Sequence, residues 1–146
     1  MIILDTDCLS LLERRSGAGF YRLSAKLAEF TPDEIATTII TFEEQMRGWM
    51  AFIAKANSIE KQISAYEKLG RFLESYRYIP IIQFDKKSGE TFQDLKSRKI
   101  KVGTMDLKIA SIAISQNALL ISRNLSDYDQ IPNLRVEDWT RENYSN

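Results

Sequence analysis

Histidine is absent from the 146-residue sequence, and this absence limits the chemistry available to the chain. Without imidazole there can be no Ser-His-Asp or Cys-His nucleophilic triad and no zinc site built on histidine. A histidine general base or acid is excluded as well. If the chain is an enzyme near neutral pH, then carboxylates, lysines or a metal held by oxygen ligands must carry the reaction.

Cysteine and long apolar runs are scarce too. Cys8 is the single cysteine, so no disulfide can form within the chain, and a reducing cytoplasm is the expected location. No apolar run approaches the roughly 18 residues that a membrane-spanning helix needs. Residues 1–5 also lack the basic and apolar regions of a signal peptide. We therefore expect a cytoplasmic protein without a membrane partner.

Neither sign of charge is in excess, since 20 Lys and Arg residues balance 20 Asp and Glu residues. The net charge therefore gives no sign of a general polyanion-binding protein, and any contact with nucleic acid must come from local charge. The composition, 44% apolar and 27% charged, is typical of a globular protein, and we expect a single domain over residues 1–146.

Two kinds of apolar pattern alternate along the chain. Short β-branched or aliphatic runs predict strands at 2–4, 35–40, 79–84, 118–122 and 134–136. Apolar residues at three-to-four spacing predict helices at 6–15, 20–30, 42–55, 57–77, 85–100 and 105–116. One apolar stripe in the fourth helix is expected to lie in the core or in a helix pair: Ile59, Ile63, Tyr66, Leu69, Leu73 and Tyr76. Strands alternating with helices imply an α/β fold, with a mostly parallel sheet of four or five strands between two helical layers.

Acidic residues follow the predicted strands at the edge where an open parallel sheet binds ligands. Asp5 directly follows the first strand, and Glu44 lies in the first turn after the second. Asp106 lies in the first turn of the helix that leads to the fourth strand. Asn124 and Asp127 come just after that fourth strand. We expect these side chains to project toward one end of the sheet.

Helix capping is the alternative explanation for each acid taken alone. Asp5 can cap the first helix, Glu44 can complete a capping box that Thr41 opens, and Asp106 suits a helix N-terminus. Together, however, the acids repel, because two carboxylates about 4 Å apart cost roughly 4 kcal/mol at an effective dielectric constant near 20. A divalent cation removes this cost, and a site made only of oxygens favours Mg²⁺ or Mn²⁺. Such a site suits the hydrolysis of phosphodiester bonds by a metal-activated water.

Four segments resemble the motifs of PIN domains, in the order in which that family has them. They are residues 3–10, 40–48, 103–110 and 120–128, and residues 131–139 resemble the usual ending of VapC proteins. The resemblance implies a PIN-like three-layer α/β/α sandwich and a Mg²⁺- or Mn²⁺-dependent endoribonuclease, the toxin of a type II VapBC toxin–antitoxin system. It also implies a homodimer and a cognate VapB-like antitoxin whose C-terminal segment covers the acidic site.

The resemblance assigns the metal to Asp5, Glu44 and Asp106. Many relatives have Asp at the fourth motif position, where this chain has Asn124. An amide oxygen can still bind or orient a water but carries no charge, so either three carboxylates suffice or Asp127 contributes.

Several neighbours of these residues have two open interpretations. Thr6 and Ser122 can hydrogen-bond a metal-bound water, although Thr6 also suits a helix cap. Arg123 can contact an RNA phosphate or pair with a site carboxylate. Trp49 and Phe52 can line a groove for a partner helix, but burial in the core is the simpler interpretation. The polar Gln45, where relatives often have an apolar residue, is expected to affect only packing.

Two other functions fit part of the sequence. Asp5-Thr6-Asp7 after a strand is also similar to the nucleophile motif of haloacid-dehalogenase-like phosphatases, but the segment near Asp106 fits that family poorly. The second alternative is a PIN fold that binds RNA or protein without cutting, and Asn124 is the observation in its favour.

Overall fold

The computed structural model describes residues 1–142, in which five strands form one sheet in the order β3-β2-β1-β4-β5. The strands are β1 (Ile2–Leu4), β2 (Ile35–Thr38), β3 (Ile81–Ile82), β4 (Leu119–Ile121) and β5 (Arg135–Glu137). Every neighbouring pair runs parallel, which confirms the predicted α/β class.

Helices make the connections that parallel strands require. They are α1 (Thr6–Arg14), α2 (Ala18–Leu27), α3 (Ile39–Ala54), α4 (Ile59–Ser75), α5 (Lys86–Ser97), α6 (Thr104–Ser115) and α7 (Leu125–Tyr128), with 3-10 turns at Pro32–Glu34 and Tyr76–Tyr78. Over residues 1–142, none of these helices has both the length and the apolar character to cross a bilayer.

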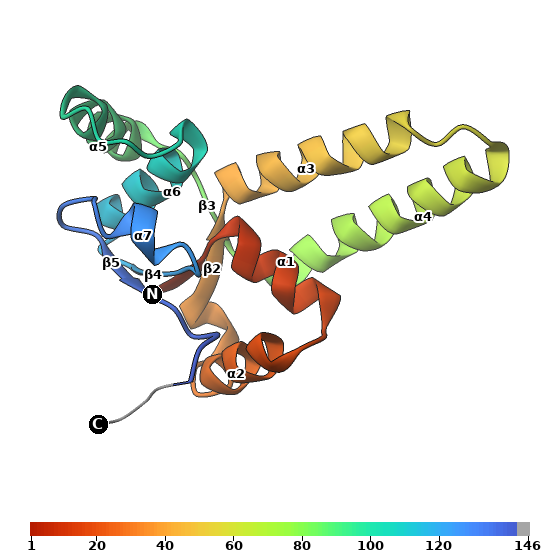
Figure 1. The fold of residues 1–146 in the computed structure, drawn as a ribbon, viewed down its shortest axis with the longest axis horizontal. Coiled ribbons are helices and arrows are strands. Elements are labelled where there is room, and N and C mark those ends of the chain that lie inside the picture. Colours follow the sequence, from red (N-terminus) through yellow and green to blue (C-terminus); the bar gives the residue numbers. More distant parts are fainter. Residues whose placement is uncertain (143–146) are drawn as a thin grey trace.

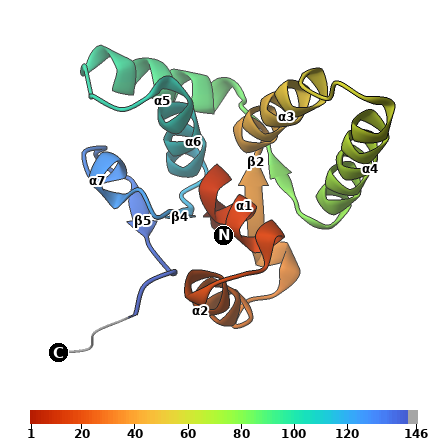
Figure 2. The same cartoon turned by 45° about the vertical axis from the view of Figure 1, so that its right-hand side comes forward.

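Alternate side chains of β1 point into two different hydrophobic cores. Ile3 packs with Ile109 of α6, whereas Ile2 and Leu4 pack with residues such as Leu23 of α2. Successive side chains of a strand point to opposite faces, so helices must cover both sides of the sheet. The views in Figures 1 and 2 show this arrangement, with α5 and α6 on one side and α1 and α2 on the other. The expected three-layer sandwich is confirmed.

Some predicted element ends are wrong. The strand expected at 35–40 ends at Thr38, and the strand expected at 79–84 is reduced to Ile81–Ile82 at the edge of the sheet. Asp85 follows this edge strand and is the N-cap of α5, as expected. Its carboxylate accepts a hydrogen bond from the Ser88 backbone at 2.9 Å. The short last strand is confirmed at Arg135–Glu137.

The predicted capping box of Thr41 and Glu44 is wrong. Helix α3 begins earlier, and its N-cap is Thr38, whose hydroxyl accepts from the Thr41 backbone at 3.1 Å. Thr41 therefore lies inside the first turn and is fully buried. Because Glu44 is not used to cap its own helix, its carboxylate is available for contacts with other elements.

The expectation of a buried stripe along α4 is also wrong for most of its members. Ile59, Ile63, Tyr66 and Leu73 are 63%, 54%, 59% and 64% exposed. Figure 1 gives the reason, because α3 and α4 extend from the sheet as a helical hairpin, and no other element of residues 1–142 lies along its outer side. The side of α4 that packs in the core is instead the one that faces α3, where Phe72 is buried and contacts Trp49.

Two substitutions on α4 test this arrangement. We expect Phe72→Ala to lower the free energy of unfolding by about 3–5 kcal/mol, because a buried aromatic side chain leaves a cavity. Ile63→Ala, at an exposed position of the same helix, should change it by less than about 0.5 kcal/mol. Urea denaturation of both variants measures the difference. A comparable loss in Ile63→Ala would show that the outer face of α4 is covered in solution.

Candidate active site

Asp5 lies at the carboxyl end of β1, where the register pairs Leu4 with Ile121 and so sets Ser122 beside Asp5. The Asp5 backbone N–H donates to Ile121 O at 3.1 Å, and the Asp5 carboxylate accepts from Cys8 N at 2.8 Å. Asp5 therefore caps α1 as expected, and it is only 5% exposed. Burial raises the pKa of the Asp5 carboxyl above its ordinary value, although contacts with Ser122 and Cys8 lower it.

Glu44 is held from α1 rather than by its own helix. The Thr6 hydroxyl donates to Glu44 Oε1 at 2.6 Å, since a hydroxyl carries one hydrogen and a carboxylate only accepts. Thr6 Oγ1 also lies 3.1 Å from Thr41 Oγ1, which lies 3.4 Å from Thr38 Oγ1. A chain of three hydroxyl groups, beginning at the end of β2, therefore ends on the Glu44 carboxylate.

Asp106 lies in the first turn of α6 and faces α7. Its Oδ1 accepts a hydrogen bond from the Tyr128 hydroxyl at 3.2 Å. Burial raises the pKa of Asp106, the Tyr128 bond lowers it, and the charge of Asp127 raises it further. Asn124 Nδ2 donates to Asp127 Oδ2 at 3.0 Å, so the amide and the acid of the fourth motif form a pair beside Asp106.

Tyr128 hydrogen-bonds Asp106 and is affected by the charges of Asp5 and Glu44, the other two acids that the resemblance to PIN domains assigns to metal binding. The residue is only 1% exposed. Burial raises the pKa of its phenol well above the ordinary value, and the negative charges of Asp106, Asp5 and Glu44 raise it further. Asp106 contacts the phenol directly, whereas Asp5 and Glu44 act on it through their charge, although the three acids are far apart in the sequence.

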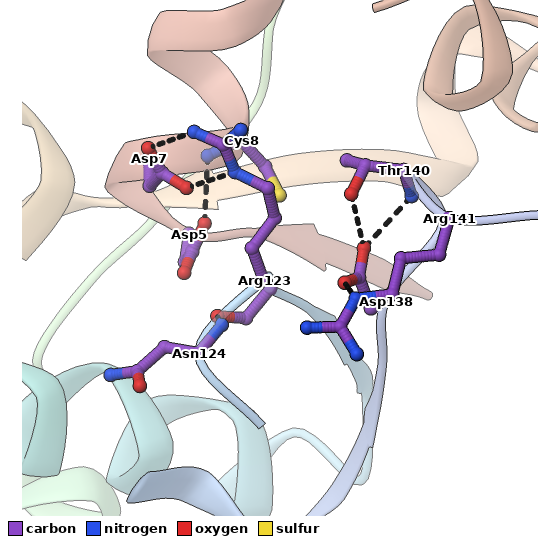
Figure 3. A network of polar contacts seen from close by, with 9 residues as sticks. Asp5, Asp7, Cys8, Arg123, Asn124, Asp138, Thr140 and Arg141 are labelled. Atoms are coloured by element: carbon purple, nitrogen blue, oxygen red, sulfur yellow. Dashed lines mark hydrogen bonds and ion pairs between the residues drawn. The ribbon is translucent and has the colours of Figure 1, made fainter. Parts of the chain in front are cut away.

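Arg123 pairs with Asp7 and with none of those three acids. Its guanidinium donates to both Asp7 carboxylate oxygens, at 2.6 and 2.7 Å (Figure 3). The side chains are 40% and 49% exposed, so the pair adds little to stability, but it lowers the pKa of Asp7. Arg123 thus joins the loop after β4 to the start of α1, and its partner Asp7 is not one of the predicted site carboxylates.

Gln45 does more than the packing that the sequence suggested. The Tyr76 hydroxyl donates to Gln45 Oε1 at 2.6 Å, and Gln45 Nε2 donates to Ser10 Oγ at 3.1 Å and lies 3.4 Å from Glu13 Oε2. These bonds tie α3 to α1 and to the turn after α4. They fix the segment of α3 that carries Glu44, so the expectation of packing alone is wrong.

The family model described as the PIN domain matches residues 2–133. The chain belongs to the PIN-domain family. Relatives of this PIN domain include Ribonuclease VapC2 of Rickettsia felis, 30% identical over 95% of this chain and 98% of the relative. Ribonuclease VapC1 of Haemophilus influenzae strain R2866 is 29% identical over the same shares. The match leaves the haloacid-dehalogenase-like alternative without support.

A solved structure agrees with this assignment. The PIN domain superposes with a TM-score of 0.70 and 29% identity on a chain of the VapBC2 structure from Rickettsia felis, which was crystallised bound to a DNA fragment from its promoter. The match covers 95% of this chain and 99% of that one. The three-layer fold is therefore shared over nearly its whole length.

PIN-domain ribonucleases of the VapC type are in general metal-dependent, and the acids of this chain offer suitable donors. Within residues 1–142, no Lys or Arg forms an ion pair with Asp5, Glu44 or Asp106. In the same part of the chain, no three acidic or cysteine residues lie close enough to hold an ion between them. Mg²⁺ keeps several waters and binds through one or two carboxylates, so this unneutralised oxygen set fits a hydrated ion.

Sequence reasoning missed two residues of this region. Tyr128 was inside the fourth motif, and an aromatic residue directly after Asp127 was the available signal. Thr41 was noticed only as a cap for its own helix. Neither contact, with Asp106 or with Thr6, was visible before the strands were ordered.

Asp106→Asn tests whether unneutralised negative charge in the candidate site lowers the stability of the folded protein. Burial raises the folded-state pKa of Asp106 above its ordinary value, so the folded protein binds the proton more tightly than the unfolded chain. The contribution of Asp106 to the free energy of unfolding therefore falls as the pH rises from about 4 through the pKa of the folded state. In EDTA at neutral pH, we expect Asp106→Asn to melt at the same or a higher temperature than the wild type.

Metal addition provides the second arm of that experiment. Mg²⁺ or Mn²⁺ should raise the melting temperature of the wild type, because an ion that binds only the folded state stabilises it, and should raise that of Asp106→Asn much less. Calorimetry over a pH series measures both effects. A large loss of stability in metal-free Asp106→Asn would instead support helix capping as the role of this acid.

Proposed function

We propose that this PIN-domain protein is a metal-dependent endoribonuclease and the toxin of a toxin–antitoxin pair, acting in the cytoplasm. The observation that carries the proposal is that Asp5, Glu44 and Asp106 have no cationic partner within residues 1–142, while the buried Tyr128 hydrogen-bonds Asp106 and is affected by the charges of Asp5 and Glu44. Burial of uncompensated carboxylates is costly, and a divalent ion offsets that cost. The names of the VapC relatives supply the class of substrate, RNA.

Asp5, Glu44 and Asp106 are the residues that would hold Mg²⁺ or Mn²⁺. When bound, the ion lowers the pKa of a water and stabilises charge on the phosphoryl and leaving oxygens. The chain itself orients the donors. Thr6 fixes Glu44, Tyr128 fixes Asp106, and Ser122 lies against Asp5. Such supporting contacts restrict the carboxylates to a few orientations and so favour one geometry of the bound water.

Asp127 fills the place of the acid that many relatives carry at the position of Asn124. The amide of Asn124 donates to Asp127, and the charge of Asp127 acts on Asp106. In this proposal Asp127 supplies the fourth negative charge, while Asn124 orients it. The alternative of a PIN fold that binds without cutting rests on the missing charge at position 124, which Asp127 replaces.

The partners follow from the same family. The solved VapBC2 structure from Rickettsia felis contains a toxin–antitoxin pair, so we expect a cognate VapB-like antitoxin for this chain, and a homodimer of the toxin. Covering the acidic end of the sheet would block access of RNA to the carboxylates. Cys8 is a buried free thiol, which suits a reducing cytoplasm.

Cleavage of RNA tests the main proposal. Purified protein incubated with total RNA should cut it in Mg²⁺ or Mn²⁺ and not in EDTA. Asp5→Asn and Asp106→Asn should each reduce the rate by about 100-fold or more, because each removes a charge while keeping nearly the same shape. Asp129→Asn, an exposed acid of the same region, is the control and should cut normally. Unchanged cleavage in Asp5→Asn or Asp106→Asn would show that the site is elsewhere.

The fourth position has its own test. Asp127→Asn removes the charge and should slow cleavage by about tenfold or more, whereas Asn124→Ala, which removes only the orienting amide, should slow it less. Rates measured over a range of Mn²⁺ concentrations separate weaker metal binding from slower chemistry. If Asp127→Asn cuts as fast as the Asp129→Asn control, three carboxylates suffice.

A further inference from the structure

Arg123 stands in the sequence between two residues that contact acids of the candidate site. Ser122 contacts the Asp5 carboxylate, and Asn124 Nδ2 donates to Asp127 Oδ2 at 3.0 Å. The long side chain at position 123 leaves the same short loop, so its direction decides whether a positive charge reaches these carboxylates. An arginine stays protonated in proteins, so a change of pH cannot remove this charge.

The Asp7 carboxylate binds this guanidinium. Arg123 Nε donates to Asp7 Oδ2 at 2.6 Å, and Arg123 Nη2 donates to Asp7 Oδ1 at 2.7 Å. Two parallel bonds of this kind are the strongest and most directional contact between an arginine and a carboxylate. In Figure 3, Arg123 reaches Asp7 on α1, while the neighbouring Asp5 carboxylate accepts from the Cys8 backbone. The cation is thus paired with an acid outside the proposed metal site.

Asp7 is the only acid that forms an ion pair with Arg123 within residues 1–142. Asp138, which Figure 3 shows on the same side of the molecule, has other partners. Its Oδ1 accepts from the Thr140 hydroxyl at 2.6 Å and the Thr140 backbone at 2.8 Å, and its Oδ2 pairs with Arg141 at 3.0 Å. Because the pair of Asp7 and Arg123 is exposed and adds little to stability, a substitution that breaks it should leave the fold intact.

The acids of the site attract any cation that can reach them. Asp5 is buried, Asp106 and Asp127 are half-buried, and none of the three forms an ion pair within residues 1–142. A guanidinium that donated to these carboxylates would occupy the oxygen lone pairs that a metal ion needs. Arg123 and a metal ion are therefore alternative partners for the same atoms.

We propose that Asp7 keeps the acidic site open to a metal ion by holding Arg123 on α1, and that a released Arg123 competes with the ion for Asp5 and Asp127. The inference rests on the metal binding of the proposed function and deepens it, because it names the pair that controls occupancy of that site. Asp7 is a positioning residue, since it acts through Arg123 and binds neither the ion nor RNA. This role also accounts for the second acid of Asp5-Thr6-Asp7, which is not a ligand in the proposed metal site.

Metal binding in the absence of RNA tests the proposal. The probe is Mn²⁺, titrated into the full chain and followed by calorimetry. We expect Asp7→Asn to raise the Kd for Mn²⁺ about tenfold, because it removes the holding charge at nearly constant shape. Arg123→Gln should bind at least as tightly as the wild type, and Asp7→Asn/Arg123→Gln should match Arg123→Gln within about twofold. The control is Glu74→Gln, which breaks an exposed ion pair with Arg77 on α4 and should bind like the wild type.

The position of Arg123 has its own readout. In ¹⁵N-labelled, metal-free Asp7→Asn, we expect the Arg123 Nε–H NMR signal to shift on addition of Mg²⁺ with the midpoint of ion binding, since the ion displaces the guanidinium. The same signal should move much less in the wild type. Asp7→Glu retains a carboxylate and should behave like the wild type in both measurements. An Arg123 signal that does not respond to Mg²⁺ in Asp7→Asn would overturn the inference.

Three other outcomes would contradict the competition between Arg123 and the ion. Equal weakening of Mn²⁺ binding in Asp7→Asn and Arg123→Gln would show that the pair only fastens the loop after β4 to α1. Binding by Asp7→Asn that equals the wild type would show that Arg123 does not reach the acids. A higher KM for RNA in Arg123→Gln at saturating Mn²⁺ would show that Arg123 binds a phosphate instead.

Rates of RNA cleavage separate this inference from the function that it extends. If the wild type cuts RNA, Asp7→Asn should cut more slowly at limiting Mn²⁺ and recover at saturating Mn²⁺, as competition requires. If the wild type binds Mn²⁺ without cutting RNA and the expected order of Kd values holds, the inference stands and the ribonuclease function fails. If the wild type cuts and both single variants bind Mn²⁺ and cut like it, the function stands and the inference fails.

Discussion

Burial of negative charge that the chain itself does not neutralise is the constraint on which this structure depends. Parallel strands end at one edge, and the register of β1 and β4 sets Asp5 next to Ser122 there, while α3 and α6 bring Glu44 and Asp106 to the same end. The raised pKa values of Asp5 and Asp106 have burial as their main cause. Burial disfavours the charged form of a carboxylate, so a cation or a proton would offset the cost of this arrangement.

Neutral hydrogen-bonding groups hold these acids in place. Hydroxyls from Thr6 and Tyr128 donate to Glu44 and Asp106, and the amide of Asn124 donates to Asp127. A lysine or arginine in the same positions could also fix the carboxylates, but it would cancel their negative charge. The nearby guanidinium of Arg123 is itself occupied by Asp7, which keeps it from the three acids.

The α3–α4 hairpin, which carries Glu44 near its base, extends away from the sheet. Gln45 and Tyr76 join its base to α1, so the hairpin has a defined position relative to Glu44. Between the hairpin and α1 lies a hollow of about 490 Å³, lined among others by Glu44, Trp49 and Phe52. Phe52 is 45% exposed, so the expectation of core burial is wrong for this residue. Four apolar residues of α4 are more than half exposed: Ile59, Ile63, Tyr66 and Leu73. One supersecondary element thus presents two surfaces of different chemistry, one of which is continuous with the acidic site.

The sequence by itself determined the α/β class, the chain order of the strands and of every helix except the short α7, the caps at Asp5 and Asp85, and which acids follow which strand, because periodicity and capping are local properties of the chain. It misplaced the start of α3, since Thr38 and Thr41 are equally good caps until the end of β2 is fixed. It could not distinguish an outward from an inward apolar stripe on α4, because the spacing is the same and only the projection of the hairpin decides burial. The contacts of Tyr128 with Asp106, Thr6 with Glu44 and Arg123 with Asp7 join distant segments, so only tertiary structure could decide them.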